Sequence, residues 1–520
     1  MKYRPLMILG AGSDVGKSIL VAALCRIFRQ EGLRVAPFKA QNMALNSFIT
    51  AEGGEMGRAQ VVQAQAAGIP PHVDMNPILL KPSSEMGSQV IVHGRVYKNL
   101  SARDYYTHKP LLVRKVMESY NRLAARYDLI VLEGAGSAVE LNLKPNDLVN
   151  FSMAKRAGAA VLLVADIDRG GVFAATIGTY HLLTRTERRL LHGFIINKFR
   201  GDISLFDSGV TIIEQRTGKR VLGVVPYMKD LLLPQEDSVA LERKMDRTVD
   251  PGRAGVHIGV IRLPHISNYT DFDPLEQEPG VSVRYVDHHS FTEALDLLIL
   301  PGSKNTIADL LHLRRTGVAE KIRDYAARGG LVVGICGGFQ MLGLTVRDPL
   351  GVEGSVTEAP GLGLLPTITT MAGEKTTTQV EAEFLGLGSD RPRVRGYEIH
   401  MGLTEAVGEG RGVFEITHSL NEPVQLQDGW ATPDFSIWGS YIHGLFDEDG
   451  FRRAWLADLR RRQGLAPLAA ADYSFEQLQE EQFDRLAEVV RRCLDIEQVL
   501  KVIGGSETKR SGPNEATPGD

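Results

Sequence analysis

The chain is short of cysteine, of excess charge of either sign and of long apolar runs. It has 3 cysteines in 520 residues, and their spacing fits neither a disulfide framework nor a zinc site. Lys plus Arg number 59 and Asp plus Glu number 63, so the net charge of −4 gives no basic field that would attract nucleic acid or anionic membrane. No stretch reaches the roughly 18 consecutive apolar residues of a membrane span, and the run 6–9 is too short for a signal-peptide core. We therefore expect a soluble cytoplasmic protein with no nucleic-acid or membrane partner.

Apolar runs of strand length recur along the chain and alternate with stretches of helical periodicity. Apolar residues make up 43% of the sequence and charged residues 23%, as in ordinary folded proteins, and 520 residues suffice for two to four domains of roughly 150 residues each. Unbroken apolar strands between helices favour parallel sheets that are covered on both faces. We predict two three-layer α/β domains with mainly parallel sheets. The predicted strands are 6–9, 33–38, 129–132, 160–165, 194–196 and 221–225, then 256–261, 281–286, 297–300 and 331–335.

The first strand runs into a glycine-rich loop with the composition of a phosphate-binding loop. Residues 10–18 read GAGSDVGKS, and a helical pattern follows them. Glycines let backbone amides approach phosphate oxygens, the helix N-terminus adds its positive dipole, and Lys17 would neutralise the β and γ phosphates. Ala11 stands where the strict pattern has glycine. With this departure the segment resembles the modified loop of dethiobiotin-synthetase-like and ParA-like proteins. The predicted nucleotide-binding residues here are Gly12, Ser13, Asp14, Val15, Gly16, Lys17 and Ser18.

Polar residues at the ends of later strands extend this predicted site. Glu133 follows the run 129–132, and a carboxylate there would anchor Mg²⁺ together with the Ser18 hydroxyl. Asn197 ends another strand, where its side-chain amide could read the adenine edge of a nucleotide. Asp166 has the same position relative to its own strand, next to an arginine and two glycines. Ligands of parallel sheets bind at this edge, so these residues are expected to lie near the loop.

The second half contains a cysteine nucleophile elbow. Residues 334–338 read GICGG, the cysteine form of the G-x-S-x-G turn, which exposes its nucleophile between a strand and a helix N-terminus. The backbone N–H of Gly337 would serve as one oxyanion donor, and the loop at Gly302 as a second. The thiol needs a general base, for which His443 in GSYIHGLF is the preferred candidate and His400 a rival. Cys25 and Cys493 are expected to be packing residues.

This half resembles class I glutamine amidotransferase domains. Their elbow, PGxxx oxyanion loop and late histidine match Cys336, Gly302 and His443. Most such domains carry glutamate two residues after the histidine, but this chain has Leu445 there. The resemblance therefore leaves open which group orients the imidazole.

The whole chain resembles the cobyric acid synthase family. The matching segments are spread from residue 10 to about 450, and they include KAQNMALNS, NPILLKP, GSQVIVHG, LEGAGSAVELNL, ADIDRGGVFA, NKFRGD, NYTDFDPL, the elbow, GYEIHMG and SYIHGLF. The implied domains are a phosphate-loop synthetase domain over 1–231, a linker over 232–254, an amidotransferase domain over 255–450, a helical extension over 451–503 and a disordered tail over 504–520. We expect the extension to pack on the second half. The sequence leaves open whether the chain forms a homo-oligomer.

This resemblance implies an ATP- and Mg²⁺-dependent amide ligase. Glutamine is hydrolysed through a Cys336 thioester, ATP phosphorylates a corrin carboxylate, and the released ammonia displaces phosphate. The implied substrate is adenosylcobyrinic acid a,c-diamide, whose b, d, e and g carboxylates become amides to give adenosylcobyric acid. By the same resemblance Asp147 would lie near the acyl-phosphate chemistry, and Lys39, Gln41 and Asn42 are candidates for the substrate or Mg²⁺ side. Asp166, at its strand end, is assigned to the substrate or acyl-phosphate side as well.

Two other functions compete with this one. Cobyrinic acid a,c-diamide synthase or a related amide ligase would share the chemistry and amidate other carboxylates. A ParA-like ATP switch with a degenerate amidotransferase domain is the more remote alternative, and the intact elbow argues against it.

Overall fold

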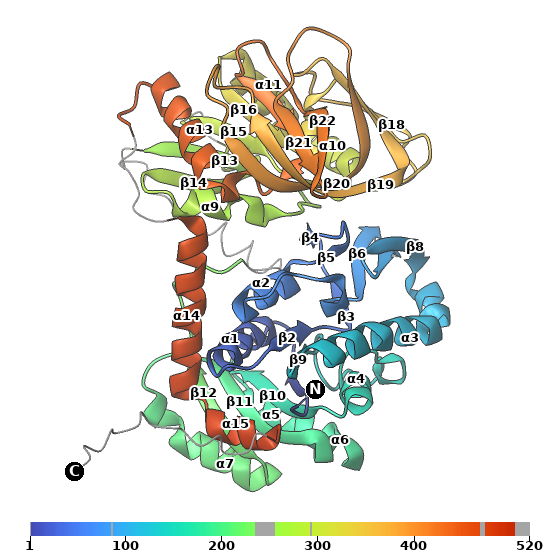
Figure 1. Ribbon diagram of the computed structural model, residues 1–520, viewed down its shortest axis with the longest axis vertical. Helices are drawn as coiled ribbons and strands as arrows, with labels where there is room; N and C mark the ends of the chain where they lie inside the picture. Colours follow the sequence, from blue (N-terminus) through green and yellow to red (C-terminus); the bar gives the residue numbers. More distant parts are fainter. Residues whose placement is uncertain (1, 85–86, 235–254, 292–293, 468–473, 505–520) are drawn as a thin grey trace, which may run out of the picture.

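The computed structural model describes residues 2–84, 87–234, 255–291, 294–467 and 474–504. Most of the predicted linker and tail, residues 235–254 and 505–520, lies outside these ranges. Figure 1 shows two lobes, one built from the first half of the chain and one from the second, with the long helix α14 (Phe475–Cys493) running along the lower one. Among the described residues no helix is both long enough and apolar enough to cross a membrane.

The first domain is built on a six-stranded parallel sheet with the order β12-β11-β10-β1-β9-β2. Alternate residues of β1 enter two separate cores: Leu6 and Ile8 pack on the side of α1, and Met7 and Leu9 pack on the other side. This is the three-layer arrangement predicted from the unbroken apolar strands. The sheet strands are β1 (Leu6–Gly10), β2 (Val35–Phe38), β9 (Leu129–Glu133), β10 (Ala160–Asp166), β11 (Leu191–Phe199) and β12 (Arg220–Pro226). The helices are α1 (Lys17–Gln30), α2 (Arg58–Ala67), α3 (Ala102–Arg126), α4 (Phe151–Ala157), α5 (Val172–Leu182), α6 (Arg185–Leu190) and α7 (Asp207–Thr217).

A smaller β layer between β2 and α3 lies on the side of the first domain that faces the second. It consists of a four-stranded sheet, β3-β6-β7-β8, and the β4–β5 hairpin. The sequence pattern does not predict these strands, because three of them have only 3 residues each and the other three lack a clean alternation of apolar and polar residues. Their bounds are β3 (Gln41–Met43), β4 (Ser47–Ile49), β5 (Glu55–Gly57), β6 (Ile78–Ser84), β7 (Gly87–Val92) and β8 (Arg95–Ser101).

The second domain combines a mainly parallel sheet, β14-β13-β15-β16-β24-β23, with a seven-stranded sheet around β19 and β20. The predicted fold class is confirmed, but the second sheet, largely antiparallel, is an addition that the sequence pattern does not predict. The strands are β13 (Val256–Ile261), β14 (Val281–Val286), β15 (Leu297–Leu300), β16 (Leu331–Ile335), β17 (Thr345–Arg347), β18 (Glu358–Pro360), β19 (Thr367–Phe384), β20 (Arg393–Ala406), β21 (Phe414–Ser419), β22 (Glu422–Asp428), β23 (Trp430–Ala431), β24 (Ile437–Ser440) and β25 (Ile442–His443). The helices are α9 (Asp273–Gln277), α10 (Thr306–Arg315), α11 (Val318–Ala327), α12 (Gly337–Leu342) and α13 (Asp449–Arg462).

The C-terminal helices do not all pack where we expected. Helix α13 belongs to the second domain's core, but α14 and α15 (Ile496–Val502) pack on the first domain. Phe483 and Val490 of α14 lie in one core cluster with α1, and Arg26 of α1 bonds to Asp484 at 2.8 Å. The expectation that this extension packs on the second half is wrong beyond α13. An amphipathic pattern predicts a helix with one apolar face, but not the surface that covers this face.

The two domains meet where β4 and β5 contact β19 and β20. The Tyr397 hydroxyl donates to the Ser47 carbonyl at 3.1 Å, and Lys375 of β19 pairs with Glu55 of β5 at 2.6 Å. Lys81 of β6 contacts the same carboxylate at 2.8 Å. Burial alone would raise the pKa of Glu55, but the two ammonium groups outweigh it and hold the pKa at about 2. A buried, charged cluster thus joins the domains close to the sites described next.

Candidate functional site

The glycine-rich loop joins β1 to α1 and surrounds the side chain of Lys17. Asp14 and Gly16 have φ angles of 52° and 92°, so the loop turns through left-handed conformations. Lys17 Nζ donates to the carbonyls of Gly12 at 3.1 Å and Gly136 at 3.0 Å. Of the predicted loop residues, five line a cavity of about 460 Å³ beside the helix N-terminus: Ser13, Asp14, Gly16, Lys17 and Ser18.

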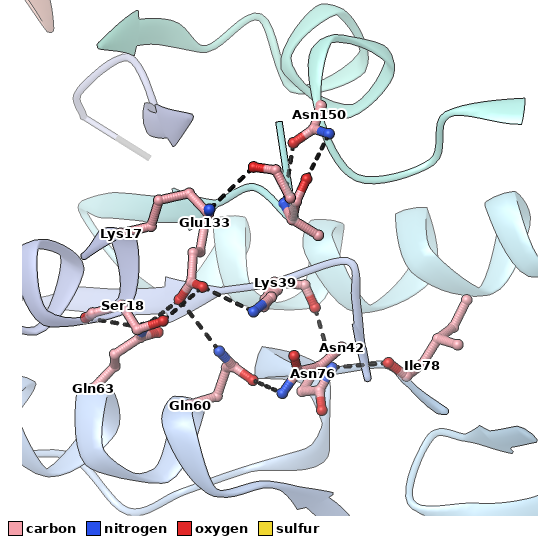
Figure 2. A network of polar contacts seen from close by, with 12 residues as sticks. Lys17, Ser18, Lys39, Asn42, Gln60, Gln63, Asn76, Ile78, Glu133 and Asn150 are labelled. Carbon is pink, nitrogen blue, oxygen red and sulfur yellow. Dashed lines mark hydrogen bonds and ion pairs between the residues drawn. The ribbon is translucent and has the colours of Figure 1, made fainter. Parts of the chain in front are cut away.

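Glu133 lies at the centre of a buried polar network on this cavity (Figure 2). Its Oε1 accepts from Ser18 Oγ at 2.9 Å and Lys39 Nζ at 2.8 Å, and its Oε2 accepts from Gln63 at 2.6 Å. Burial alone would raise the pKa of Glu133, but the charge and hydrogen bond of Lys39 outweigh it and lower the pKa. An ionised carboxylate next to a hydroxyl fits Mg²⁺, which prefers oxygen ligands and takes few of them from protein in phosphate sites.

Three of the other predicted residues lie around the same loop. Asn197 Nδ2 donates to the Val15 carbonyl at 2.8 Å, so this side chain supports the loop and also lines the cavity. Asn42 lines the cavity too and donates to Gln60. Asp166 pairs with Lys198 at 3.0 Å, and Lys198 in turn contacts Asp14.

Gln41 and Asp147 line a second, larger cavity of about 660 Å³. The Tyr105 hydroxyl donates to Gln41 Oε1 there. Both oxygens of Asp147 accept backbone N–H groups at the start of α4, including Asn150 N at 2.8 Å and Ser152 N at 2.8 Å. The structure therefore divides the predicted substrate-side residues between two neighbouring cavities, and it gives Asp147 a role in the local turn.

Cys336 lies between β16 and α12 in a strained conformation. Its φ of 51° and ψ of −107° are rare for a residue with a side chain, as expected for a nucleophile elbow. A Cβ on Gly338 would come within 2.0 Å of the Leu300 carbonyl, so only glycine permits this approach of α12 to β15. Cys336 is 6% exposed and lines a small cavity of about 50 Å³ at the domain seam.

The predicted oxyanion residues lie on either side of this cysteine. A Cβ on Gly337 would come within 2.7 Å of the backbone nitrogen of Ser303, so the elbow packs directly on the loop after β15. A Cβ on Gly302 would lie 3.1 Å from Cε1 of His443. The geometry thus brings Cys336, His443, Gly302 and Gly337 together from three separate segments of the chain.

His443 is oriented by Asp271, a residue that the sequence patterns do not identify. His443 Nδ1 lies 2.6 Å from Asp271 Oδ2, and the Gly444 N–H donates to the other oxygen at 3.2 Å. Burial alone would lower the pKa of His443, but Asp271 and Cys336 outweigh it and raise the pKa to about 10. Asp271 therefore occupies the orienting role that Leu445 cannot perform. It lies in the NYTDFDPL segment, whose match to the family was the only available signal.

The rival base His400 lies on β20 and lines the same cavity. Its Nδ1 is 2.8 Å from the Gly402 carbonyl, and its ring stacks on Tyr441 with a centroid separation of 3.8 Å. His443 Nδ1 lies 2.6 Å from the Asp271 carboxylate, whereas His400 Nε2 is 3.9 Å from that of Glu398, so the geometry favours His443 as the base.

Comparisons with known proteins match both domains. Residues 6–239 match the CobQ/CobB/MinD/ParA nucleotide binding domain, and residues 257–451 match the CobB/CobQ-like glutamine amidotransferase domain. A cobyric acid synthase of Syntrophobacter fumaroxidans is 56% identical over 97% of this chain and 99% of its own length. Those of Moorella thermoacetica and Citrobacter koseri are 50% and 48% identical, each over 96% of this chain and at least 97% of their own length. By its domains, and by identity along nearly its whole length, the chain belongs to the cobyric acid synthase family.

Proposed function

We propose that this protein amidates the b, d, e and g carboxylates of adenosylcobyrinic acid a,c-diamide, using ATP and glutamine, to give adenosylcobyric acid. One observation carries the proposal. The same chain holds a phosphate loop in its first domain and a cysteine elbow with its general base in its second domain, on opposite sides of the seam where the two domains meet. Carboxylate activation and ammonia release are the two halves of glutamine-dependent amide synthesis. The geometry of the Cys336 site argues against a degenerate amidotransferase domain.

The glutaminase half begins with attack of the Cys336 sulfur on the side-chain carbonyl carbon of glutamine. The tetrahedral oxyanion would accept hydrogen bonds from the backbone at Gly302 and Gly337. The His443 imidazolium gives its proton to the departing ammonia, leaving a thioester that water hydrolyses to glutamate. Asp271 stabilises the imidazolium and holds the ring in one orientation.

The synthetase half transfers the γ-phosphoryl group of ATP to an oxygen of the corrin carboxylate. Lys17 and the loop amides would neutralise the phosphates as charge moves, and Ser18 and Glu133 would hold Mg²⁺, which supplies further neutralisation when bound. Ammonia then attacks the acyl carbon and phosphate leaves. Each amide thus consumes one ATP, one glutamine and one water, and yields ADP, phosphate and glutamate.

Mass spectrometry of corrin products tests the proposed function. The protein is incubated with MgATP, glutamine and adenosylcobyrinic acid a,c-diamide, and we expect a product with four added amides. Amidation of cobyrinic acid but not of its a,c-diamide would instead assign the earlier step to this chain. No amidation of either compound would favour the ATP switch.

Asp271→Asn is expected to lower kcat of glutamine hydrolysis by on the order of 10²- to 10³-fold, because the imidazolium loses its charged partner and its fixed orientation. Asp271 raises the pKa of His443, so its loss should lower that pKa and move the alkaline limb of the pH–rate profile to lower pH. The measurement is ammonia release as a function of pH.

The exposed Asp390 of the same domain supplies the matched control, Asp390→Asn, with an unchanged rate and profile. A reduced rate with an unmoved alkaline limb in Asp271→Asn would mean that Asp271 only supports the fold.

A further inference from the structure

The second cavity, of about 660 Å³, adjoins the nucleotide cavity. Both are lined by Met43, Ala135 and Gly136, the last of which accepts a hydrogen bond from Lys17. A ligand in the second cavity would therefore need to extend only past these residues to reach the phosphates. Tyr105 and Leu143 line the second cavity and not the first.

The rim of this second cavity is unusually apolar for a protein surface. Met43 is 60% exposed and Leu143 is 48% exposed, and Leu141, two residues away on the same turn, is 50% exposed. Large apolar side chains that gather at a cavity mouth mark a binding site for an apolar body. Charged side chains also line this cavity, namely Glu140, Lys144 and Asp147. Lys17 and Lys39 line the nucleotide cavity beside it, where they would meet a carboxylate.

One β layer separates this cavity from the Cys336 site. Leu80 of β6 and Val90 of β7 are cross-strand partners that line the second cavity. The next pair is Lys81 and Gln89, and successive side chains of a strand point to opposite faces. Lys81 accordingly lines the Cys336 cavity on the other face of the layer. An acceptor in the second cavity would thus lie next to both the phosphate source and the ammonia source.

The proposed reaction makes a particular demand on its acceptor site. Four different side chains at the edge of one macrocycle must reach a single phosphate position in turn. A site with many fixed polar contacts would favour one orientation, whereas an open apolar surface admits several. The macrocycle is a broad apolar body with carboxylates at its edge, which matches a cavity with an exposed apolar rim beside a cavity that holds cationic groups.

We propose that this second cavity binds the corrin macrocycle by its apolar face, with one edge carboxylate at a time extending past Met43 and Gly136 to the phosphate loop. The inference rests on the proposed function and adds the location of the acceptor to it. Leu143 is then a specificity-determining residue for the corrin and has no role in glutamine hydrolysis.

The test is Leu143→Glu, assayed for the KM of the corrin in amidation, the KM of ATP and glutaminase kcat. Loss of one apolar contact and the added repulsion of the corrin carboxylates should raise the corrin KM by about 10-fold or more. The KM of ATP and the glutaminase rate should stay within about 2-fold. Leu143→Met should restore the wild-type corrin KM. Leu205→Glu, on an even more exposed leucine that lines neither cavity, should leave all three quantities unchanged.

An unchanged corrin KM in Leu143→Glu, with wild-type protein amidating the corrin, would overturn the assignment of the cavity and leave the proposed function standing. A rise in the corrin KM of the same size in Leu205→Glu would also overturn it, since the effect would then come from added surface charge. A wild-type protein that amidates no corrin would overturn the proposed function, and this assignment with it.

Discussion

Cys336→Ala should abolish glutamine-dependent amidation while amidation with free ammonia continues. Glutaminase activity should fall by at least about 10⁴-fold, because removal of a covalent nucleophile leaves only binding and the oxyanion donors. The synthetase cavity lies across the domain seam and has no lining residue in common with the Cys336 cavity, so ammonium salts should still supply the nucleophile. The measurement is amide formation with glutamine and, separately, with ammonium chloride at alkaline pH.

Cys493→Ala is the matched control for this variant. Cys493 is a half-buried thiol at the end of α14, on the first domain, and its loss should leave both activities unchanged. Equal loss of both activities in Cys336→Ala, with the protein folded, would contradict the separation of ammonia release from carboxylate activation.

Lys17→Ala should produce the complementary result. Lys17 is 7% exposed and is held over the loop by the Gly12 and Gly136 carbonyls. Without its charge, phosphoryl transfer should slow by on the order of 10³-fold, with glutamine and with ammonia alike. Glutaminase activity should persist, because Cys336, His443 and Asp271 are unaffected. Amide formation and glutamate release are measured in parallel.

Lys2→Ala, at a lysine side chain that is 76% exposed, controls for the loss of one positive charge. Amidation by Lys17→Ala at more than a tenth of the wild-type rate would remove Lys17 from the phosphate site.

Features encoded by adjacent residues were predictable from sequence. The phosphate loop at 10–18 and the elbow at 334–338 each contain glycines a few positions apart. Because these glycines permit the backbone turn, their spacing in the sequence predicts it. Most of the parallel strands were predictable for a similar reason, since full burial on both faces requires unbroken apolar runs such as 129–132 and 160–165.

Features that join distant segments were not predictable in the same way. Asp271 and His443 are 172 residues apart, and no local pattern links a single aspartate to a remote histidine. The docking of α14 on α1 depends on surface complementarity between residues more than 450 positions apart, such as Arg26 and Asp484. The small β layer of β3–β8 was not predicted, because β3, β4 and β5 have only 3 residues each and the longer β6, β7 and β8 have neither an unbroken apolar run nor a regular alternation.

The most direct test of the two-site account is isotopic. The protein is given MgATP, adenosylcobyrinic acid a,c-diamide, glutamine labelled with ¹⁵N in its side-chain amide, and an equal concentration of unlabelled ammonium, and the corrin product is analysed by mass spectrometry. We predict that the new amides carry mainly ¹⁵N in the wild type and only ¹⁴N in Cys336→Ala. New amides that carry only ¹⁴N in the wild type would show that glutamine is not the nitrogen donor and would contradict the account.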